Sequence, residues 1–176
     1  MATFPYSTKG AFDAAKSGIF GDSSQDEINF TAVASPLLLV DTDFSGMPAA
    51  TLDGNTKIEK LTLSSNNSNS VTGGANFHSV GISSVFGGSQ ADYLDFSAYN
   101  TSVRFFGGNG NDTIIGGNSN DSLDGQSGND SMVGGAGNDF YTLDSTCDVV
   151  TELASGGTDS VTASVSGYTL SAETEF

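Results

Sequence analysis

The chain has 176 residues, which is enough for one domain or one elongated repeat array. Its formal net charge of −16 and its sequence pI near 4.1 argue against nucleic acid and anionic membrane surfaces as partners. The single cysteine, Cys147, excludes an intrachain disulfide, and we expect it to be a half-buried residue at a strand end.

The first part of the chain predicts a cap followed by irregular strands. Ser7–Gly18 is expected to form a short helix that covers the open end of the array. Gly21–Asn29 has an acidic sixth residue and an apolar eighth residue, and we interpret it as a degenerate coil without a metal. Strands are predicted at Leu37–Val40 and Ile58–Leu63, with a loop at Met47–Thr56 between them.

The middle of the chain is less regular. Asp41–Gly46 resembles the start of an EF-hand loop, but Leu52 stands where that loop needs a bidentate glutamate, so an EF-hand is rejected. Ser64–Ser70 is predicted to be a polar turn. Two weak strands are then expected, at Gly74–Phe77 and Val80–Val85.

Gly87–Asp95 is a clear repeat unit, with Asp92 in the sixth place and Leu94 in the eighth. The segment around Ser102–Phe105 has strand character but no aspartate, so no metal site is predicted between it and the loop that ends at Asp121.

Residues 107–142 are four unbroken nine-residue repeats: GGNGNDTII, GGNSNDSLD, GQSGNDSMV and GGAGNDFYT. The first six residues of each repeat favour a turn, and the last three favour a short strand with one apolar side chain facing inward. These apolar residues are Ile114, Leu123, Met132 and Tyr141. One repeat cannot bury its apolar residue alone, so the repeats must stack around a shared core. The pattern predicts an all-β fold, a parallel β-roll or β-solenoid.

Stacking also aligns the aspartates that close each turn, at about 4.8 Å between adjacent parallel strands. Residues 105–176 hold eleven of the twenty-one acidic residues and none of the five basic ones, since no Lys or Arg follows Arg104. The missing positive charge must therefore come from outside the chain. Ca²⁺ accepts six to eight oxygen ligands in flexible geometry, whereas Mg²⁺ requires a tighter octahedron. Transition metals prefer His or Cys, and the repeats contain neither.

The repeats resemble GGxGxDxUx, the calcium-binding nonapeptide of the RTX (repeats-in-toxin) family. The resemblance implies a β-roll with two nonapeptides per coil and at least two calcium sites, each between a loop and the loop two repeats further on. It places Asp112 against Gly125–Asp130, and Asp121 against Gly134–Asp139. Ser119 and Gln126 replace usual glycines without removing a carboxylate. The implied metal-binding residues are Gly107, Gly108, Asn109, Gly110, Asp112, Gly116, Gly117, Asn118, Ser119, Asp121, Gly125, Ser127, Gly128, Asp130, Gly134, Gly135, Gly137 and Asp139.

Two alternatives to a calcium-binding roll are a flexible linker rich in Gly, Asn and Asp, and a metal-free β-solenoid. A linker would not keep an apolar residue at every ninth position. The sequence therefore divides into an amino-terminal cap with degenerate coils (1–86), the calcium-binding roll (87–142) and degenerate carboxyl-terminal coils (143–176).

After Thr142 the repeat phase weakens but persists, with Asp148 and Asp159 in aspartate positions. Phe140–Leu170 resembles the segment that closes many RTX arrays, but the chain ends where a further strand would begin. Either the chain is a fragment, or its final coil is open and pairs head to tail with another copy, which would produce filaments.

The sequence lacks the HExxH and GxSxG motifs, and we expect no enzymatic activity. No amino-terminal signal peptide is visible, and the apolar runs are too short for membrane insertion. RTX proteins typically use type I export without such a peptide, so the resemblance implies a secreted or cell-surface calcium-binding protein. A self-assembling filament or surface layer is one form of this hypothesis. The alternatives are an adhesin, an ice- or glycan-binding module using the outward asparagines at 111, 120, 129 and 138, and the secretion module of a longer RTX protein.

Overall fold

A computed structural model describes residues 3–5, 26–29, 37–39, 58–63, 68–73, 81–152 and 156–168. These residues are all-β and contain no helix, which confirms the predicted fold class. The helix predicted at Ser7–Gly18, the loop at Met47–Thr56, the segment Asp41–Gly46 and the strand at Gly74–Phe77 lie outside the described residues.

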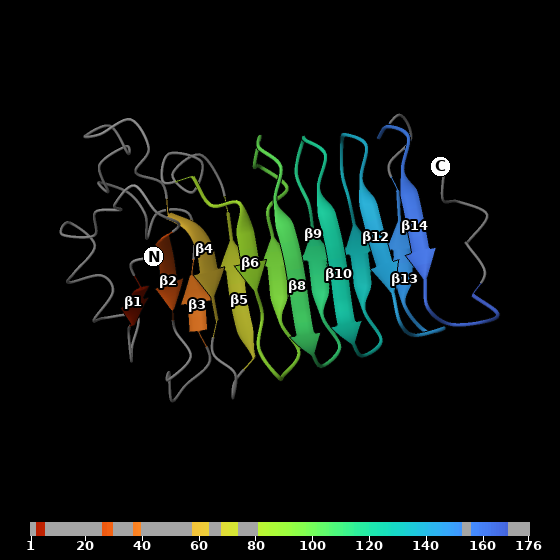
Figure 1. Cartoon of the computed structure of the whole chain (residues 1–176), viewed down its shortest axis with the longest axis horizontal. Coiled ribbons are helices and arrows are strands. Elements are labelled where there is room, and N and C mark those ends of the chain that lie inside the picture. Colours follow the sequence, from red (N-terminus) through yellow and green to blue (C-terminus); the bar gives the residue numbers. More distant parts are fainter. Residues whose placement is uncertain are drawn as a thin grey trace.

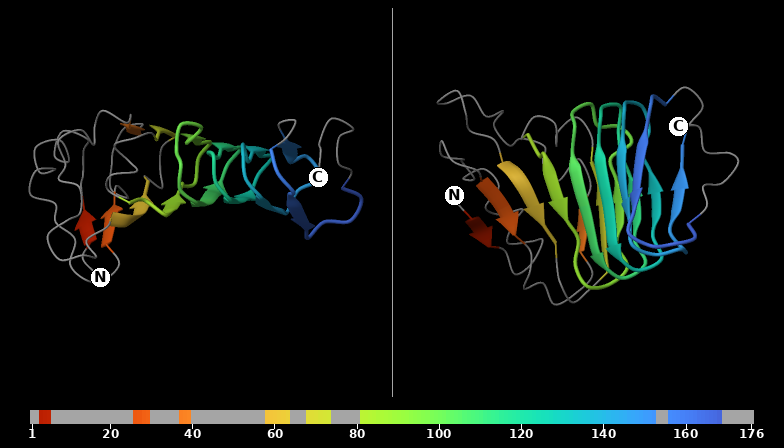
Figure 2. Two further views of the ribbon diagram at one scale, coloured as in Figure 1. Left: turned by 90° about the horizontal axis from the view of Figure 1, so that it is seen from above. Right: turned by 45° about the vertical axis from the view of Figure 1, so that its right-hand side comes forward.

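The strands form two parallel sheets that face each other along the long axis of the molecule (Figures 1 and 2). In spatial order, the eight-stranded sheet contains β1 (Thr3–Pro5), β2 (Asp26–Asn29), β4 (Ile58–Thr62), β6 (Ser84–Phe86), β8 (Arg104–Asn109), β10 (Ser122–Ser127), β12 (Phe140–Leu143) and β14 (Ser160–Ala163). The six-stranded sheet contains β3 (Leu37–Leu39), β5 (Asn69–Thr72), β7 (Tyr93–Asp95), β9 (Thr113–Ile115), β11 (Ser131–Val133) and β13 (Val149–Thr151). From β2 onward the described strands alternate between the two sheets, so each pair of consecutive strands makes one coil.

The pairing register shows that one coil contains two nonapeptides. Leu123 pairs with Phe105 on one side and with Tyr141 on the other, each 18 residues away. Ile114 pairs with Met132, again 18 residues away, in the opposite sheet. Loops two repeats apart therefore lie on adjacent coils.

The core is a line of side chains enclosed between the two sheets. The apolar residues at the eighth place of the repeats, Ile114, Leu123, Met132 and Tyr141, are all 0 % exposed, as predicted. The core continues beyond the four repeats through Leu61, Val71, Val85, Leu94, Phe105, Leu143 and Val150.

The connection between β7 and β8 is longer than a repeat loop and contributes aromatic residues to this core. The Phe96 ring lies edge-on to Phe105 at 5.0 Å and to Tyr99 at 5.7 Å between centroids. The Tyr99 hydroxyl donates a hydrogen bond to the Ile82 carbonyl at 2.8 Å, so its polar atom is satisfied inside the core. Both Phe96 and Tyr99 are fully buried in this connection.

Several predicted bounds require correction. Two strands of the eight-stranded sheet continue into the predicted turns: β8 extends through Asn109 and β10 through Ser127. The turn predicted at Ser64–Ser70 ends earlier, because β5 begins at Asn69, whose side chain is buried. The strand predicted at Val80–Val85 begins only at Ser84, since Gly81 forms a turn with a φ of 81°. Cys147 is exposed and lies in a loop, not half-buried at a strand end.

Gln126 is the only non-glycine residue with positive φ in the described part of the chain, at 61°. It pairs with Gly108 of the preceding coil, where φ is 111°. Left-handed backbone costs a residue with a side chain about 1–2 kcal/mol relative to glycine. We therefore predict that Gln126→Gly stabilises the folded protein by about 1 kcal/mol after the added chain entropy of glycine is counted.

Urea denaturation at saturating calcium tests this prediction. Gln90→Gly provides the matched control, because Gln90 lies in a loop without positive φ and gains only the entropic penalty. A Gln126→Gly variant no more stable than wild type would contradict the prediction.

Candidate metal centre

Two columns of buried aspartates run along the molecule, one at each edge where the chain crosses between the sheets. The first column contains Asp92, Asp112, Asp130 and Asp148, and the second contains Asp121, Asp139 and Asp159. All seven side chains are at most 7 % exposed. The loops that carry them connect consecutive strands, so the coil spacing brings equivalent carboxylates together.

Each carboxylate is fixed by the backbone of the preceding coil. In the first column, Oδ1 of Asp112 accepts a hydrogen bond from the Asp92 amide at 2.8 Å, and Oδ1 of Asp130 accepts one from the Asp112 amide at 2.8 Å. In the second column, Oδ1 of Asp139 accepts from the Asp121 amide at 2.7 Å. The same bond joins Asp148 to the Asp130 amide, Asp159 to the Asp139 amide, and Asp121 to the Val103 amide. We call this arrangement the carboxylate–amide ladder.

The second oxygen of each carboxylate turns toward the glycine that opens its own repeat. A Cβ built on Gly107 would collide with Oδ2 of Asp112, and the same is true of Gly116 with Asp121, Gly125 with Asp130 and Gly134 with Asp139. The first position of each repeat therefore requires glycine because a side chain there would occupy the space of a carboxylate oxygen. None of these four glycines has a positive φ.

Adjacent loops also pack backbone against backbone. A Cβ on Gly128 would collide with the Gly110 carbonyl oxygen, and a Cβ on Gly135 would collide with the Gly117 carbonyl oxygen. Carbonyl oxygens and carboxylates from two adjacent coils thus converge at each edge, which is the loop pairing expected from the repeat spacing.

Three of the Oδ2 atoms are buried without a hydrogen-bond partner: those of Asp112, Asp130 and Asp139. The equivalent atoms of Asp92, Asp121 and Asp148 have hydrogen-bond donors. Oδ2 of Asp92 accepts from the Gly88 amide, and Oδ2 of Asp121 accepts from the Gly117 amide, both at 2.7 Å. A buried charged oxygen without a donor is costly, so these three positions call for a cation.

The same three carboxyls have the largest shifts in acidity. Burial raises the pKa of Asp112 to about 7, and negative charges on Asp92 and Asp130 add to the effect. Burial likewise raises the pKa of Asp139 to about 7 and that of Asp130 to about 6, with neighbouring carboxylates contributing in both cases. The folded chain without a cation therefore strongly disfavours the charged form of all three groups.

The structure places the sequence-predicted residues in two classes. The glycines and aspartates of the four loops lie at the two edges and bring their oxygens together as described above. Asn109, Asn118 and Ser127 are exposed; Asn109 and Ser127 are the last residues of β8 and β10, and Asn118 lies in a loop. Ser119, which replaces a usual glycine, lies opposite Gly137 of the next coil. A Cβ on Gly137 would lie within 3 Å of the Ser119 backbone carbonyl.

The outward asparagines are used within the roll. Oδ1 of Asn111 accepts from the Asn129 amide at 3.0 Å, and Oδ1 of Asn120 accepts from the Asn138 amide at 2.8 Å. Oδ1 of Asn138 continues the row to the Thr158 amide at 2.9 Å. These acceptors join adjacent coils along the edge of the roll, while the side chains themselves remain exposed.

Sequence reasoning missed one buried carboxylate, Glu152, which is 6 % exposed and follows β13. Thr151 pairs with Val133, so Glu152 has the position in its coil that Gly134 has in the preceding coil. A glutamate in a glycine position gives no repeat signal, and only the pairing register reveals it.

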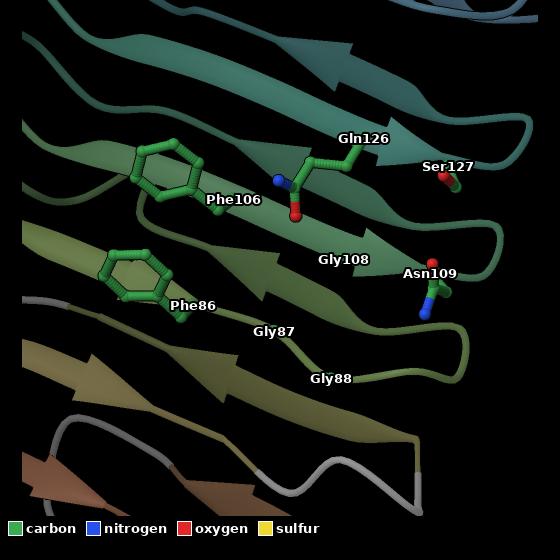
Figure 3. Close-up of a pocket in the computed structure, with 8 residues that line it drawn as sticks. All are labelled: Phe86, Gly87, Gly88, Phe106, Gly108, Asn109, Gln126 and Ser127. Carbon is green, nitrogen blue, oxygen red and sulfur yellow. The ribbon is translucent and has the colours of Figure 1, made fainter.

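A groove on the outer face of the eight-stranded sheet, about 290 Å³ in volume, lies beside these loops (Figure 3). Phe86 and Phe106 stack along it with centroids 4.7 Å apart, and the Lys60 Nζ lies 4.7 Å from the Phe86 ring centroid. The groove ends at Gly88, Asn109 and Ser127. The two stacked phenylalanine rings thus join adjacent coils on the outer face of the roll, as the asparagine side chains do at its edge.

The donor set fits a hard divalent cation. Within the described residues, carboxylate and carbonyl oxygens line the two edges, whereas His and Cys are absent from the loops of the repeats. Ca²⁺ prefers such oxygens and tolerates their irregular geometry.

Residues 106–141 match the family model of the RTX calcium-binding nonapeptide repeat in four copies. No curated protein and no solved structure is significantly similar to this chain. Within the described part of the chain, there is no helix long and apolar enough to cross a membrane.

Proposed function

Because residues 106–141 are four RTX calcium-binding nonapeptide repeats, we propose that this chain is a secreted β-roll that folds on binding extracellular Ca²⁺ and has a structural, non-enzymatic role outside the cell. One observation carries the proposal. Three buried aspartate oxygens lack a hydrogen-bond donor, in a part of the chain that contains no Lys or Arg.

Two loop pairs are proposed to hold the ions. In the first, Asp112 acts with the carbonyls and carboxylate of loop Gly125–Asp130. In the second, Asp121 acts with loop Gly134–Asp139. The unpartnered Oδ2 atoms and the close carbonyls of adjacent coils support this assignment. When bound, calcium neutralises the column and replaces the missing donors.

Calcium binding is thereby linked to folding. At the low calcium level inside a cell, carboxylate repulsion and the entropy of the glycine-rich loops keep the chain unfolded. Millimolar calcium outside the cell stabilises the fold by RT ln(1 + [L]/Kd) for each site, about 2.7 kcal/mol at a hundredfold excess over Kd. This coupling would allow export of an open chain and folding at its destination.

A calcium titration followed by circular dichroism tests the proposal. At pH 7.5 we expect strand signal to be lost in EGTA and restored cooperatively by calcium, with magnesium at the same concentration much less effective. A chain with equal strand content and equal unfolding midpoint in EGTA and in calcium would contradict the proposal. The triple variant D112N/D130N/D139N serves as a control, since it should no longer respond to calcium.

A second candidate function is self-assembly into a filament or surface layer. Among the described residues, β13 and β14 each pair with a strand on one side only, so the last coil presents backbone groups at its outer edge. Light scattering should rise when calcium is added to the folded protein. A calcium-bound protein that sediments as a monomer at high concentration would exclude this candidate.

A further inference from the structure

A group of three buried carboxylates lies beyond the four matched repeats. One carboxylate oxygen from each of Asp139, Glu152 and Asp159 lies within 4.8 Å of the others, and the three residues are 2 %, 6 % and 7 % exposed. Only Asp139 belongs to the matched residues. The three residues come from the loops at the ends of β11 and β13, which lie side by side at the second edge.

The loops that carry these residues are joined to each other. Oδ1 of Asp159 accepts a hydrogen bond from the Asp139 amide at 2.7 Å, and the Gly156 carbonyl accepts one from the Gly137 amide at 2.6 Å. A Cβ on Gly157 would collide with the Gly137 carbonyl oxygen. The contact between these two coils is thus the same as the contact between coils of the matched repeats.

Glu152 distinguishes this place from the repeat loops. It occupies the position of the first glycine, which in the four repeats has no side chain and leaves space for an aspartate oxygen. Its side chain brings a third carboxylate to a place where the repeats have two. The Tyr141 hydroxyl donates a hydrogen bond to Oε1 of Glu152, which fixes the orientation of the added carboxylate.

An independent observation indicates that this group binds a ligand. Oδ2 of Asp139 is buried and has no hydrogen-bond partner. A Cβ on Gly134 would collide with both this atom and the Tyr141 hydroxyl oxygen, so the unpartnered oxygen lies next to the hydroxyl that holds Glu152. The atom is therefore directed toward the carboxylate group and not toward solvent.

From this geometry we infer that Asp139, Glu152 and Asp159 form an additional calcium site, with Tyr141 orienting Glu152 beside the ion. The site has one more negative ligand than a loop pair with two aspartates, and a higher charge on the ligands raises calcium affinity. It is located where the matched repeats end, so its ion would join the last repeat coil to the coil that follows. The inference rests on the proposed function in that both involve calcium.

The test uses the full chain and compares Glu152→Gln with Asp124→Asn. The glutamine keeps the size of the side chain and its acceptor for Tyr141. Asp124 lies on the outer face of β10, and its Oδ1 accepts from the Gln126 amide, a bond that asparagine retains. Isothermal titration and native mass spectrometry should show one fewer calcium ion, or one site weakened at least tenfold, in E152Q but not in D124N.

Thermal unfolding separates a ligand from a merely structural residue. If Glu152 is a ligand, E152Q should raise the unfolding midpoint of the calcium-free protein at pH 6, where its fold persists, because one buried charge is removed, and reduce the increase caused by calcium. If Glu152 only anchors Tyr141, the variant should lower the midpoint equally in both conditions, and the inference would be wrong.

Terbium provides a readout that does not depend on any variant at Glu152. The chain contains no tryptophan, so tyrosine is the only efficient sensitiser of bound Tb³⁺. Tyrosine-excited emission should fall in Tyr141→Phe while the number of bound ions is unchanged. Undiminished emission in Tyr141→Phe would contradict the site. A wild-type protein that binds no calcium would contradict the proposed function itself, whereas calcium binding that is identical in wild type and E152Q would contradict only this inference.

Discussion

Replacing Gly128 by alanine is expected to destabilise the calcium-bound roll by about 3 kcal/mol, at the upper end of the usual cost of overpacking. The added methyl group would collide with the Gly110 carbonyl oxygen and would lie 2.9 Å from Oδ1 of Asp130. Neither neighbour can move freely. The Gly110 amide is bound to the Ser127 carbonyl at 2.9 Å, and Oδ1 of Asp130 accepts from the Asp112 amide. The substitution would therefore separate two loops that the proposed ion joins.

Urea unfolding in saturating calcium, together with the calcium midpoint of folding, measures this effect. Ser131→Ala is the matched control, because Ser131 lies three residues away on the outer side of β11 and the change removes no core atom. We expect the control to remain within about 0.5 kcal/mol of wild type. If G128A behaved like the control, close packing of adjacent loops would not be required for the fold.

Calcium-free and calcium-saturated protein are expected to respond to pH in opposite directions. In the calcium-free fold, burial raises the pKa of Asp112 and Asp139 to about 7 and that of Asp130 to about 6, above the ordinary value of 3.8. Between about pH 4 and pH 7 the folded state then binds more protons than the unfolded state. Because stability falls with pH wherever the folded state binds more protons, the calcium-free fold should lose stability as pH rises through this window.

Calcium reverses the trend, since its ligands must be deprotonated and protons are released when it binds. As the pH rises from 5, the unfolding midpoint of protein stripped of calcium on a chelating resin should thus fall until the fold is lost near pH 7.5, whereas the midpoint in millimolar calcium should rise up to pH 8. Titrations in two buffers of different ionisation enthalpy should reveal proton release near pH 6.5. Parallel pH profiles in the two conditions would show that these carboxyls are not buried as described.

The repeats determined most of the fold in advance. Apolar residues at every ninth position required a stacked roll, and the burial of Leu123 and Met132 confirms that requirement. The aspartates of both columns were also predictable, including Asp148, which keeps the nine-residue phase, and Asp159, which follows it after eleven residues. These predictions succeeded because the pattern is local and every coil repeats the same pairing.

Other features depend on contacts between coils, which a single repeat does not reveal. The strand extension through Gly108 arises from pairing with the adjacent coil, and the sequence alone predicts only a turn there. Glu152 lies outside the nonapeptide pattern, and its place opposite Gly134 of the preceding coil follows only from the strand register. Phe96 and Tyr99 lie in an irregular connection, so no periodicity predicts that they complete the core.

The carboxylate–amide ladder gives the molecule a polarity. Each aspartate of the two columns accepts from the backbone of the coil before it, 18, 20 or 23 residues earlier in the chain, and among the described residues none accepts from the coil after it. The two ends of this ladder are therefore chemically different. Carboxylate acceptors lie at the amino-terminal end, and backbone amide donors lie at the carboxyl-terminal end. Coils can therefore be added to the stack in one orientation only. Removing coils from the carboxyl side would remove the carboxylates that accept hydrogen bonds from the turn before them, whereas removing coils from the amino side would not.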